Sequence, residues 1–201
     1  DSDFQPFLDS VCPAKFMEGV QDPYGGILLK ESGYLDIPAY LKAMAEMFYE
    51  KGILLHDTLE NSSLEFGDNM VTCAGITAKK IIFCDGTSAT KNTFFNWLPF
   101  RPVKGEILEV AMNARFPAIV NRGVFVVTIG EGIFRVGSTY NNNELDWEPS
   151  EEGKSYLINR LSQLITTQPE VLRHYAGVRP ATADRRPILG LHPEYETIGL
   201  F

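Results

Sequence analysis

Cysteine and histidine are scarce in this sequence, and neither forms a cluster. The 201 residues include three histidines and three cysteines, Cys12, Cys73 and Cys84. An odd number of cysteines without regular spacing does not form a disulfide framework. Because the sequence has no CxxC and no grouped histidines, it also lacks the ligand spacing of a transition-metal site. We therefore expect reduced thiols, a cytoplasmic setting and no metal.

An excess of positive charge is also missing. The chain has 18 Lys and Arg against 26 Asp and Glu, which gives a formal net charge of −8. Phosphate backbones and anionic membranes are bound by basic faces, so neither is expected as the main partner. No run approaches the roughly 20 apolar residues of a membrane-spanning helix, so no membrane span is expected. The segment 1–16 lacks a basic stretch followed by an apolar one, so no secretory signal is expected.

The motifs of nucleophilic catalysis and of phosphate binding are absent as well. The sequence contains no GxSxG, no GxGxxG and no GxxxxGK[ST]. The acidic pair Glu151–Glu152 stands at the expected start of a helix, where it complements the helix dipole. We therefore expect no side chain to act as a catalytic nucleophile, acid or base.

Two segments have the spacing and the capping residues of helices. The first starts at Asp36 as N-cap, with Pro38 in the first turn, and ends at Gly52. Its apolar stripe, which we expect to pack in a core, comprises Leu41, Met44, Ala45 and Phe48. The second starts after Ser150, and its apolar face comprises Leu157, Leu161, Leu164 and Ile165.

Short apolar runs separated by glycine and polar residues account for most of the remainder. We expect strands within residues 24–30, 53–59, 70–75, 76–86 and 102–111, and a hairpin within 122–140 that turns at Gly130–Gly132. This order predicts a mixed α/β chain of the α+β kind, with a largely antiparallel sheet flanked by helices.

The segment GVRPATADRRPILG (177–190) combines three arginines with two prolines, which exclude a helix interior. We interpret Arg185 and Arg186 as solvated turn residues. Arg179 differs, because Pro180 restricts it to an extended conformation. An arginine held in this way suits bidentate binding of a carboxylate, although a solvated turn remains the alternative for this segment.

Five segments, taken in order, resemble the D-amino-acid oxidase-like FAD-dependent oxidoreductases, the group that includes glycine oxidase, sarcosine oxidase and D-amino-acid dehydrogenase. They are GGILLKESGYLDIPAYLKAMAEMFYEKGILL, ITAKKIIFCDGTSA, FRPVKGEILEV, GIFRVGSTY and YAGVRPATADRRPILG, and they cover about residues 24–201. Three departures stand out. The N-terminal dinucleotide fingerprint of the family is absent, Asp85 replaces a small residue, and Phe125 replaces a tyrosine that some members have.

The resemblance implies a division of the chain into two parts. Residues 1–29 and 93–175 would form a substrate-binding domain with the antiparallel sheet. Residues 30–92 and 176–201 would be returning pieces of a Rossmann-like FAD domain. Because the fingerprint that holds the FAD pyrophosphate is missing, we expect a fragment that is inactive alone and does not retain FAD.

The resemblance also implies a site and a reaction. Arg179 matches the arginine that binds the substrate carboxylate, and Phe125 and Tyr140 match side chains that line the pocket over the flavin. The positions that match cofactor contacts are Leu59, Cys84, Asp85, Gly86 and Pro180. The implied reaction oxidises the C–N bond of an amino acid or an N-alkyl amino acid, a small amine with a carboxylate, by hydride transfer to FAD.

Two alternatives stay open at this point. The first is an FAD-dependent dehydrogenase or oxidase of 2-hydroxy acids, since the sequence does not distinguish these substrates from amines. The second is a degenerate, non-enzymatic binding or scaffold relative, which the departures at Asp85 and Phe125 motivate.

Overall fold

The chain divides into two compact units, each with its own hydrophobic core. The computed structural model describes residues 2–67 and 69–201. The first unit consists of Asp1–Gly33 and Val103–Val178, and the second of Tyr34–Pro102 and Arg179–Phe201. The chain therefore crosses between the units three times.

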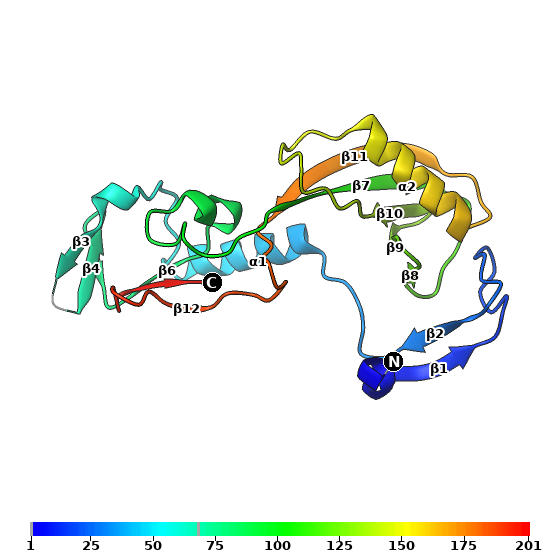
Figure 1. Cartoon of the computed structure of the whole chain (residues 1–201), viewed down its shortest axis with the longest axis horizontal. Coiled ribbons are helices and arrows are strands. Elements are labelled where there is room, and N and C mark those ends of the chain that lie inside the picture. The colour runs from blue at the N-terminus through cyan, green and yellow to red at the C-terminus, as the bar shows by residue number, and fades with distance from the viewer. Residues whose placement is uncertain (1, 68) are drawn as a thin grey trace. The chain divides into compact units, whose positions relative to one another are not determined.

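The first unit contains a five-stranded sheet with helix α2 along one face (Figure 1). The strand order is β11-β7-β10-β9-β8, and β10 pairs antiparallel with both β7 and β9. The elements are β7 (Val103–Ala111), β8 (Val120–Asn121), β9 (Phe125–Gly130), β10 (Ile133–Gly137), α2 (Glu151–Leu164) and β11 (Glu170–Arg179). A separate antiparallel pair is formed by β1 (Leu8–Cys12) and β2 (Gly26–Leu29), after a 3₁₀ helix over Ser2–Phe7.

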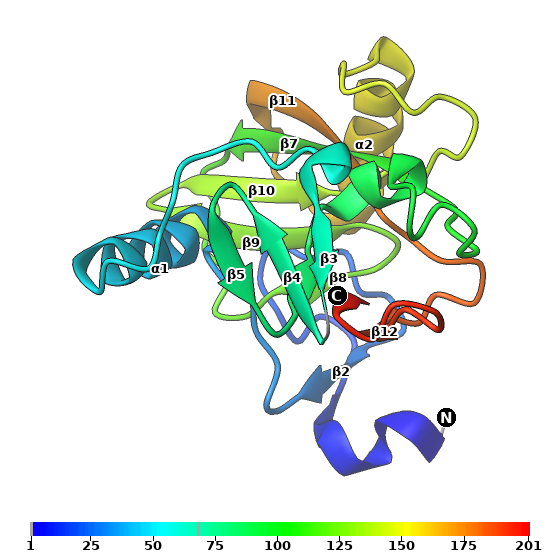
Figure 2. The same ribbon diagram turned by 90° about the vertical axis from the view of Figure 1, so that its left-hand side faces the viewer.

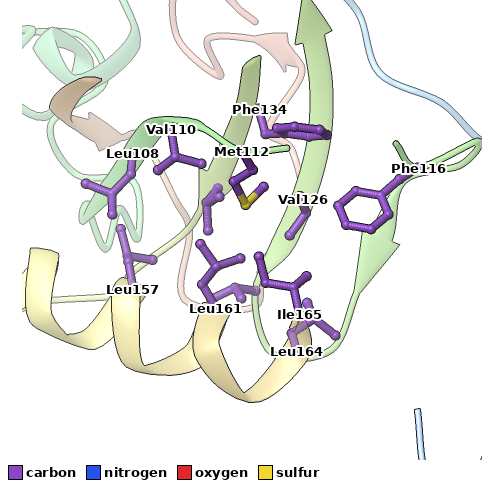
Figure 3. Close-up of a cluster of buried hydrophobic side chains, with 12 residues drawn as sticks. Leu108, Val110, Met112, Phe116, Val126, Phe134, Leu157, Leu161, Leu164 and Ile165 are labelled. Carbon is purple, nitrogen blue, oxygen red and sulfur yellow. The ribbon is translucent and has the colours of Figure 1, made fainter. Parts of the chain in front are cut away.

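The core of the first unit lies between α2 and the sheet (Figure 3). Helix α2 begins where predicted, because the Ser150 hydroxyl accepts a hydrogen bond of 3.0 Å from the Gly153 N–H. Its buried side chains are Leu157, Leu161 and Leu164, and Ile165 follows directly. They pack on the sheet residues Leu108, Val110, Val126, Phe134 and Val136. The predicted apolar face of this helix is confirmed.

The second unit contains helix α1, two small sheets and a compact apolar cluster. Strands β3 (Glu65–Gly67), β4 (Met70–Cys73) and β5 (Ile76–Ala78) form an antiparallel sheet, whose three strands are labelled in Figure 2. In the other sheet, β13 (Ile198–Leu200) pairs parallel with β6 (Ile81–Phe83) and antiparallel with β12 (Gly190–Leu191). The cluster comprises Phe83, Ala89, Phe95, Ile198 and Leu200.

Most of the local predictions are confirmed, including the mixed, largely antiparallel fold class. The Asp36 carboxylate accepts a hydrogen bond of 3.1 Å from the Ala39 N–H, so it caps α1 (Ile37–Glu50) as expected. Strands β9 and β10 form the predicted hairpin. No helix within residues 2–67 and 69–201 is long and apolar enough to cross a membrane.

Two expectations were wrong, and both concern the second unit. Residues 53–59 form no strand, because an extended segment becomes one only when a neighbouring backbone completes its ladder. The apolar stripe of α1 does not pack in a core: none of its residues is buried, and Leu41 is 58% exposed. Helical periodicity predicts an apolar face but carries no information on what covers it.

Candidate functional site

The sheet of the first unit has a second face, which points away from α2. Side chains alternate along a strand, and Phe134 and Val136 point into the core under α2. Arg135 and Gly137 therefore point the other way. Their cross-strand partners share this second face: Glu109 and Ile107 on β7, Val127 and Phe125 on β9.

Phe125 lies over a glycine on this second face. Gly137 is its cross-strand partner, and a Cβ added at Gly137 would come 2.8 Å from Phe125 Cζ and 2.5 Å from Ile107 Cγ2. These distances are shorter than a van der Waals contact, so the ring and Ile107 occupy the space that a side chain would need. The structure thus places the Phe125 ring on the second face of the sheet beside Gly137.

Tyr140 lies three residues beyond the end of β10. It is exposed and lines a polar hollow of about 730 Å³ next to the start of α2. Other residues that line this hollow are Glu106, Asn141, Glu144 and Tyr156. Phe125 does not line it. The ring of Phe125 lies on the second face of the sheet and Tyr140 lines the hollow beside α2, and both remain predicted substrate contacts.

Arg179 is the last residue of β11, so it has the extended backbone that Pro180 was predicted to impose. A tight turn follows, in which the Thr182 hydroxyl donates to the Arg186 carbonyl at 2.7 Å and Asp184 accepts from the Arg186 N–H at 3.1 Å. Arg185 and Arg186 are exposed in this turn, as the sequence indicated. Backbone hydrogen bonds from Arg101 to Ala181 and from Ala183 to Pro99 also anchor the turn, and Arg179 precedes it at the end of a strand.

The turn after β6 holds the predicted cofactor residues Cys84, Asp85 and Gly86. One Asp85 carboxylate oxygen accepts a hydrogen bond of 3.1 Å from the Asn92 amide, and the other is buried without a partner among the described residues. Gly86 has a φ of +57°, and a Cβ built there would meet no atom within 4 Å. A carboxylate accepts hydrogen bonds from N–H or hydroxyl donors and repels a phosphate. The carboxylate of Asp85 therefore makes the turn unsuited to a pyrophosphate, and the backbone at Gly86 leaves room for close approach.

Leu59 lies at the other end of β6. It lines an apolar hollow of about 400 Å³ together with Ile81, the first residue of that strand, whereas Cys84 follows the last. The strand thus separates Leu59 from the turn at Cys84–Gly86. If both contact one ligand, that ligand must extend along β6.

A charged network on the second face was missed by the sequence analysis. The Arg135 guanidinium donates to Glu109 at 3.0 Å, and the Tyr175 hydroxyl donates to the same carboxylate at 3.3 Å. Arg173 donates to the Tyr175 hydroxyl at 3.3 Å, and this hydrogen bond raises the pKa of Arg173. A signal was present at Arg135, which is the one charged residue in the otherwise apolar strand β10.

Buried charges on the α2 side of the sheet have structural roles. Glu106 accepts hydrogen bonds from the Ser150 N–H at 2.9 Å and the Ser150 hydroxyl at 2.8 Å, and it lies 2.8 Å from His174 Nε2. Its carboxylate thereby links β7, the start of α2 and β11. The described residues include no group of three or more His, Cys, Asp and Glu that could hold a metal ion.

Comparisons with curated proteins identify relatives that are longer than this chain. The chain is 26% identical over 190 residues to a glycine oxidase of Geobacillus kaustophilus, and covers 49% of that protein. It is 23% identical over 187 residues to the Campylobacter concisus tRNA 5-methylaminomethyl-2-thiouridine biosynthesis bifunctional protein MnmC, with 90% of this chain and 29% of the relative covered. The chain thus spans half or less of the length of these relatives.

Solved structures show the same fold. The Bacillus cereus glycine oxidase structure superposes with a TM-score of 0.77 at 20% identity, covering 92% of this chain and 55% of the other. The glycine oxidase of Geobacillus kaustophilus gives 0.74 at 22% identity. The sequence model of the FAD dependent oxidoreductase family matches residues 5–201. The chain therefore belongs to the FAD-dependent oxidoreductase family.

Proposed function

We propose that the protein containing this chain is an FAD-dependent enzyme that oxidises the C–N bond of an amino acid or an N-alkyl amino acid. The observation that carries the proposal is Arg179, an arginine at the end of β11 that is followed by Pro180. Glycine oxidases among the relatives act on an amino acid by their names, which supports an amine with a carboxylate as the substrate class.

In this proposal Arg179 binds and orients the substrate carboxylate. A guanidinium can donate two parallel hydrogen bonds to a carboxylate, and its strand position limits the geometries that it can adopt. Such positioning lowers the barrier by fixing the reacting carbon before chemistry begins. Phe125 offers an apolar ring and no hydroxyl, so the carboxylate would depend on Arg179 more strongly than in relatives with a tyrosine there.

FAD would be held in part by the backbone at Cys84–Gly86 and near Leu59, and Asp85 would accept from a donor of the cofactor. When bound, FAD supplies the acceptor for the hydride that leaves the carbon bearing the amine. The resulting imine is hydrolysed by water. No side-chain base is required when the substrate amine binds in its neutral form.

The three cysteines are free thiols in the structure, which supports a cytoplasmic location as part of the proposal. Fractionation of cells that produce the protein, followed by immunoblotting, tests this part. Recovery in a membrane or extracytoplasmic fraction would contradict it.

Replacing Arg179 tests the proposal directly. In the FAD-loaded protein that contains this chain, Arg179→Ala should raise KM for an amino acid substrate about 100-fold, since two charge-assisted hydrogen bonds are lost. Arg185→Ala is the matched control, because Arg185 is exposed in the following turn, and it should leave KM unchanged. Steady-state kinetics with glycine, N-methylglycine and D-amino acids measure both values.

Other outcomes of the same experiment would replace the proposal. Equal, small effects of the two substitutions would remove Arg179 from the site. Oxidation of 2-hydroxy acids but not of amines would indicate the alternative substrate class. A colourless protein that takes up no added FAD would favour a non-enzymatic relative.

A further inference from the structure

We infer that Arg135 is a second anion-binding residue, which selects substrates whose side chain ends in a carboxylate. The inference rests on the proposed function and specifies the substrate class for it. It starts from the second face of the sheet, where Arg135 lies two residues from Gly137 along β10.

Arg135 and Phe125 are close neighbours on this face by strand geometry. Phe125 pairs with Gly137, and Arg135 pairs with Val127 on the same strand, β9. Two residues along a strand correspond to roughly 6.5 Å. A ligand that contacts the Phe125 ring with its apolar part can therefore reach the guanidinium with a group a few bonds away.

The hydrogen bonds of Arg135 are incomplete. One of its terminal nitrogens donates to Glu109 at 3.0 Å, whereas its Nε is buried and has no partner among the described residues. Because a guanidinium has five N–H donors and one hydrogen bond goes to Glu109, Arg135 keeps donors for a ligand oxygen. About a third of the Arg135 side chain is exposed, so a ligand can approach it.

The charges around Arg135 favour an anion. Arg135 and Arg173 carry two positive charges, while Glu109 carries one negative charge and binds both Arg135 and the Tyr175 hydroxyl. This cluster is thus net positive in a chain whose formal charge is −8. A local positive field on the face that carries Phe125 attracts an acidic group there and does not attract a neutral one.

Binding of two matched, unreactive acids tests the inference without turnover. Glutarate has two carboxylates, and glutaramate has the same length with one carboxylate replaced by an amide. Isothermal titration calorimetry on the FAD-loaded protein should show tighter binding of glutarate by about tenfold or more, the value of one charge-assisted hydrogen bond. Arg135→Gln should abolish this preference, and Arg135→Lys should keep part of it.

Two further variants separate anion binding from a purely structural ion pair. Glu109→Gln removes the competing carboxylate, so it should tighten glutarate binding several-fold and leave glutaramate binding unchanged. If Arg135 and Glu109 formed only a structural ion pair, Glu109→Gln would not tighten the binding of glutarate. Arg160→Gln is the matched control, because Arg160 lies on α2 and stacks on Tyr156, and it should leave the glutarate preference intact.

Turnover of glutamate and glutamine then links the site to the reaction. The parent protein should favour glutamate through KM, and Arg135→Gln should remove this preference. Equal binding of glutarate and glutaramate by the parent protein, or a preference that survives Arg135→Gln, would overturn the inference. A preference in binding without flavin reduction by any amine would leave the anion site standing and contradict the proposed function.

Discussion

Helix α2 in the first unit buries one face completely, whereas helix α1 in the second unit buries none of its residues. Both helices run for 14 residues, and both have a capping side chain at the N-terminus. Leu157, Leu161 and Leu164 of α2 lie against the sheet, and the apolar residues of α1 reach only partial burial. The same sequence pattern therefore has two different structural outcomes.

The difference shows where stability comes from in each unit. A buried leucine contributes through the apolar surface that it removes from water and through close packing. In α1, propensity and capping support the helix and core packing contributes little. Substitutions in α2 should thus affect unfolding far more than equivalent ones in α1.

The largest expected effect comes from a pair of leucine truncations. Leu161→Ala in α2 leaves a cavity in the core and should lower the free energy of unfolding by about 2–5 kcal/mol. Leu41→Ala in α1 should change it by less than about 0.5 kcal/mol, because the side chain is mostly exposed. Urea unfolding followed by circular dichroism measures both. A similar loss for the two variants would mean that α1 is covered in solution.

The second-largest expected effect is the change in melting temperature when one ion pair in each unit is broken. Lys104 is 2% exposed in its side chain and binds Asp146 at 2.5 Å, while Lys42 and Glu46 on α1 are both solvent-exposed. Asp146→Asn leaves a buried ammonium without its partner, so it should lower the melting temperature clearly. Glu46→Gln is the matched control and should change it little.

The same pair predicts a dependence on pH. The hydrogen bond to Lys104 lowers the pKa of Asp146, and the hydrogen bond to Asp146 raises the pKa of Lys104. The contribution of Asp146 is therefore present above the usual aspartate pKa of about 4, and it is lost as the pH falls through the lowered value. The contribution of Lys104 to the stability of the fold is lost only as the pH rises through its raised pKa. Thermal melts should show a shallower loss of stability below about pH 4 for Asp146→Asn than for the parent; parallel curves would contradict this.

The smallest expected effects come from the two helix caps. Ser150→Ala removes the cap of α2 and a hydrogen bond to the buried Glu106, so it should cost about 1–2 kcal/mol of unfolding free energy. Asp36→Ala removes only the cap of α1 and should cost about 1 kcal/mol or less. Chemical denaturation with Ser155→Ala as a control for the surface of α2 measures the difference. A larger loss for Asp36→Ala would reverse the comparison between the units.

The predictable parts of the fold are those with local causes. Asp36 and Ser150 cap their helices through hydrogen bonds within three residues, and the β9–β10 hairpin turns at its glycines. Pro180 restricts Arg179 by direct steric contact, and Arg179 ends a strand. The segment 53–59 was mispredicted because a strand depends on a distant partner for its hydrogen bonds.

The candidate site was only partly predictable, for a related reason. The position of Arg179 and the open turn at Gly86 follow from the residues around them. The network of Glu109, Arg135 and Tyr175 joins three strands that are far apart in sequence, so no local pattern specifies it. Alternation along a strand shows that two residues share a face, and it does not show which strands lie side by side.

The sequence by itself determined the helix boundaries, the hairpin, the extended arginine and the resemblance to the flavoenzyme family. These features depend on backbone sterics, capping and the order of short motifs, all of which are local. The tertiary structure alone decided which apolar stripe became a core and which charges met on the second face of the sheet. Burial and ion pairing require contacts between distant residues, and only the folded chain brings those residues together.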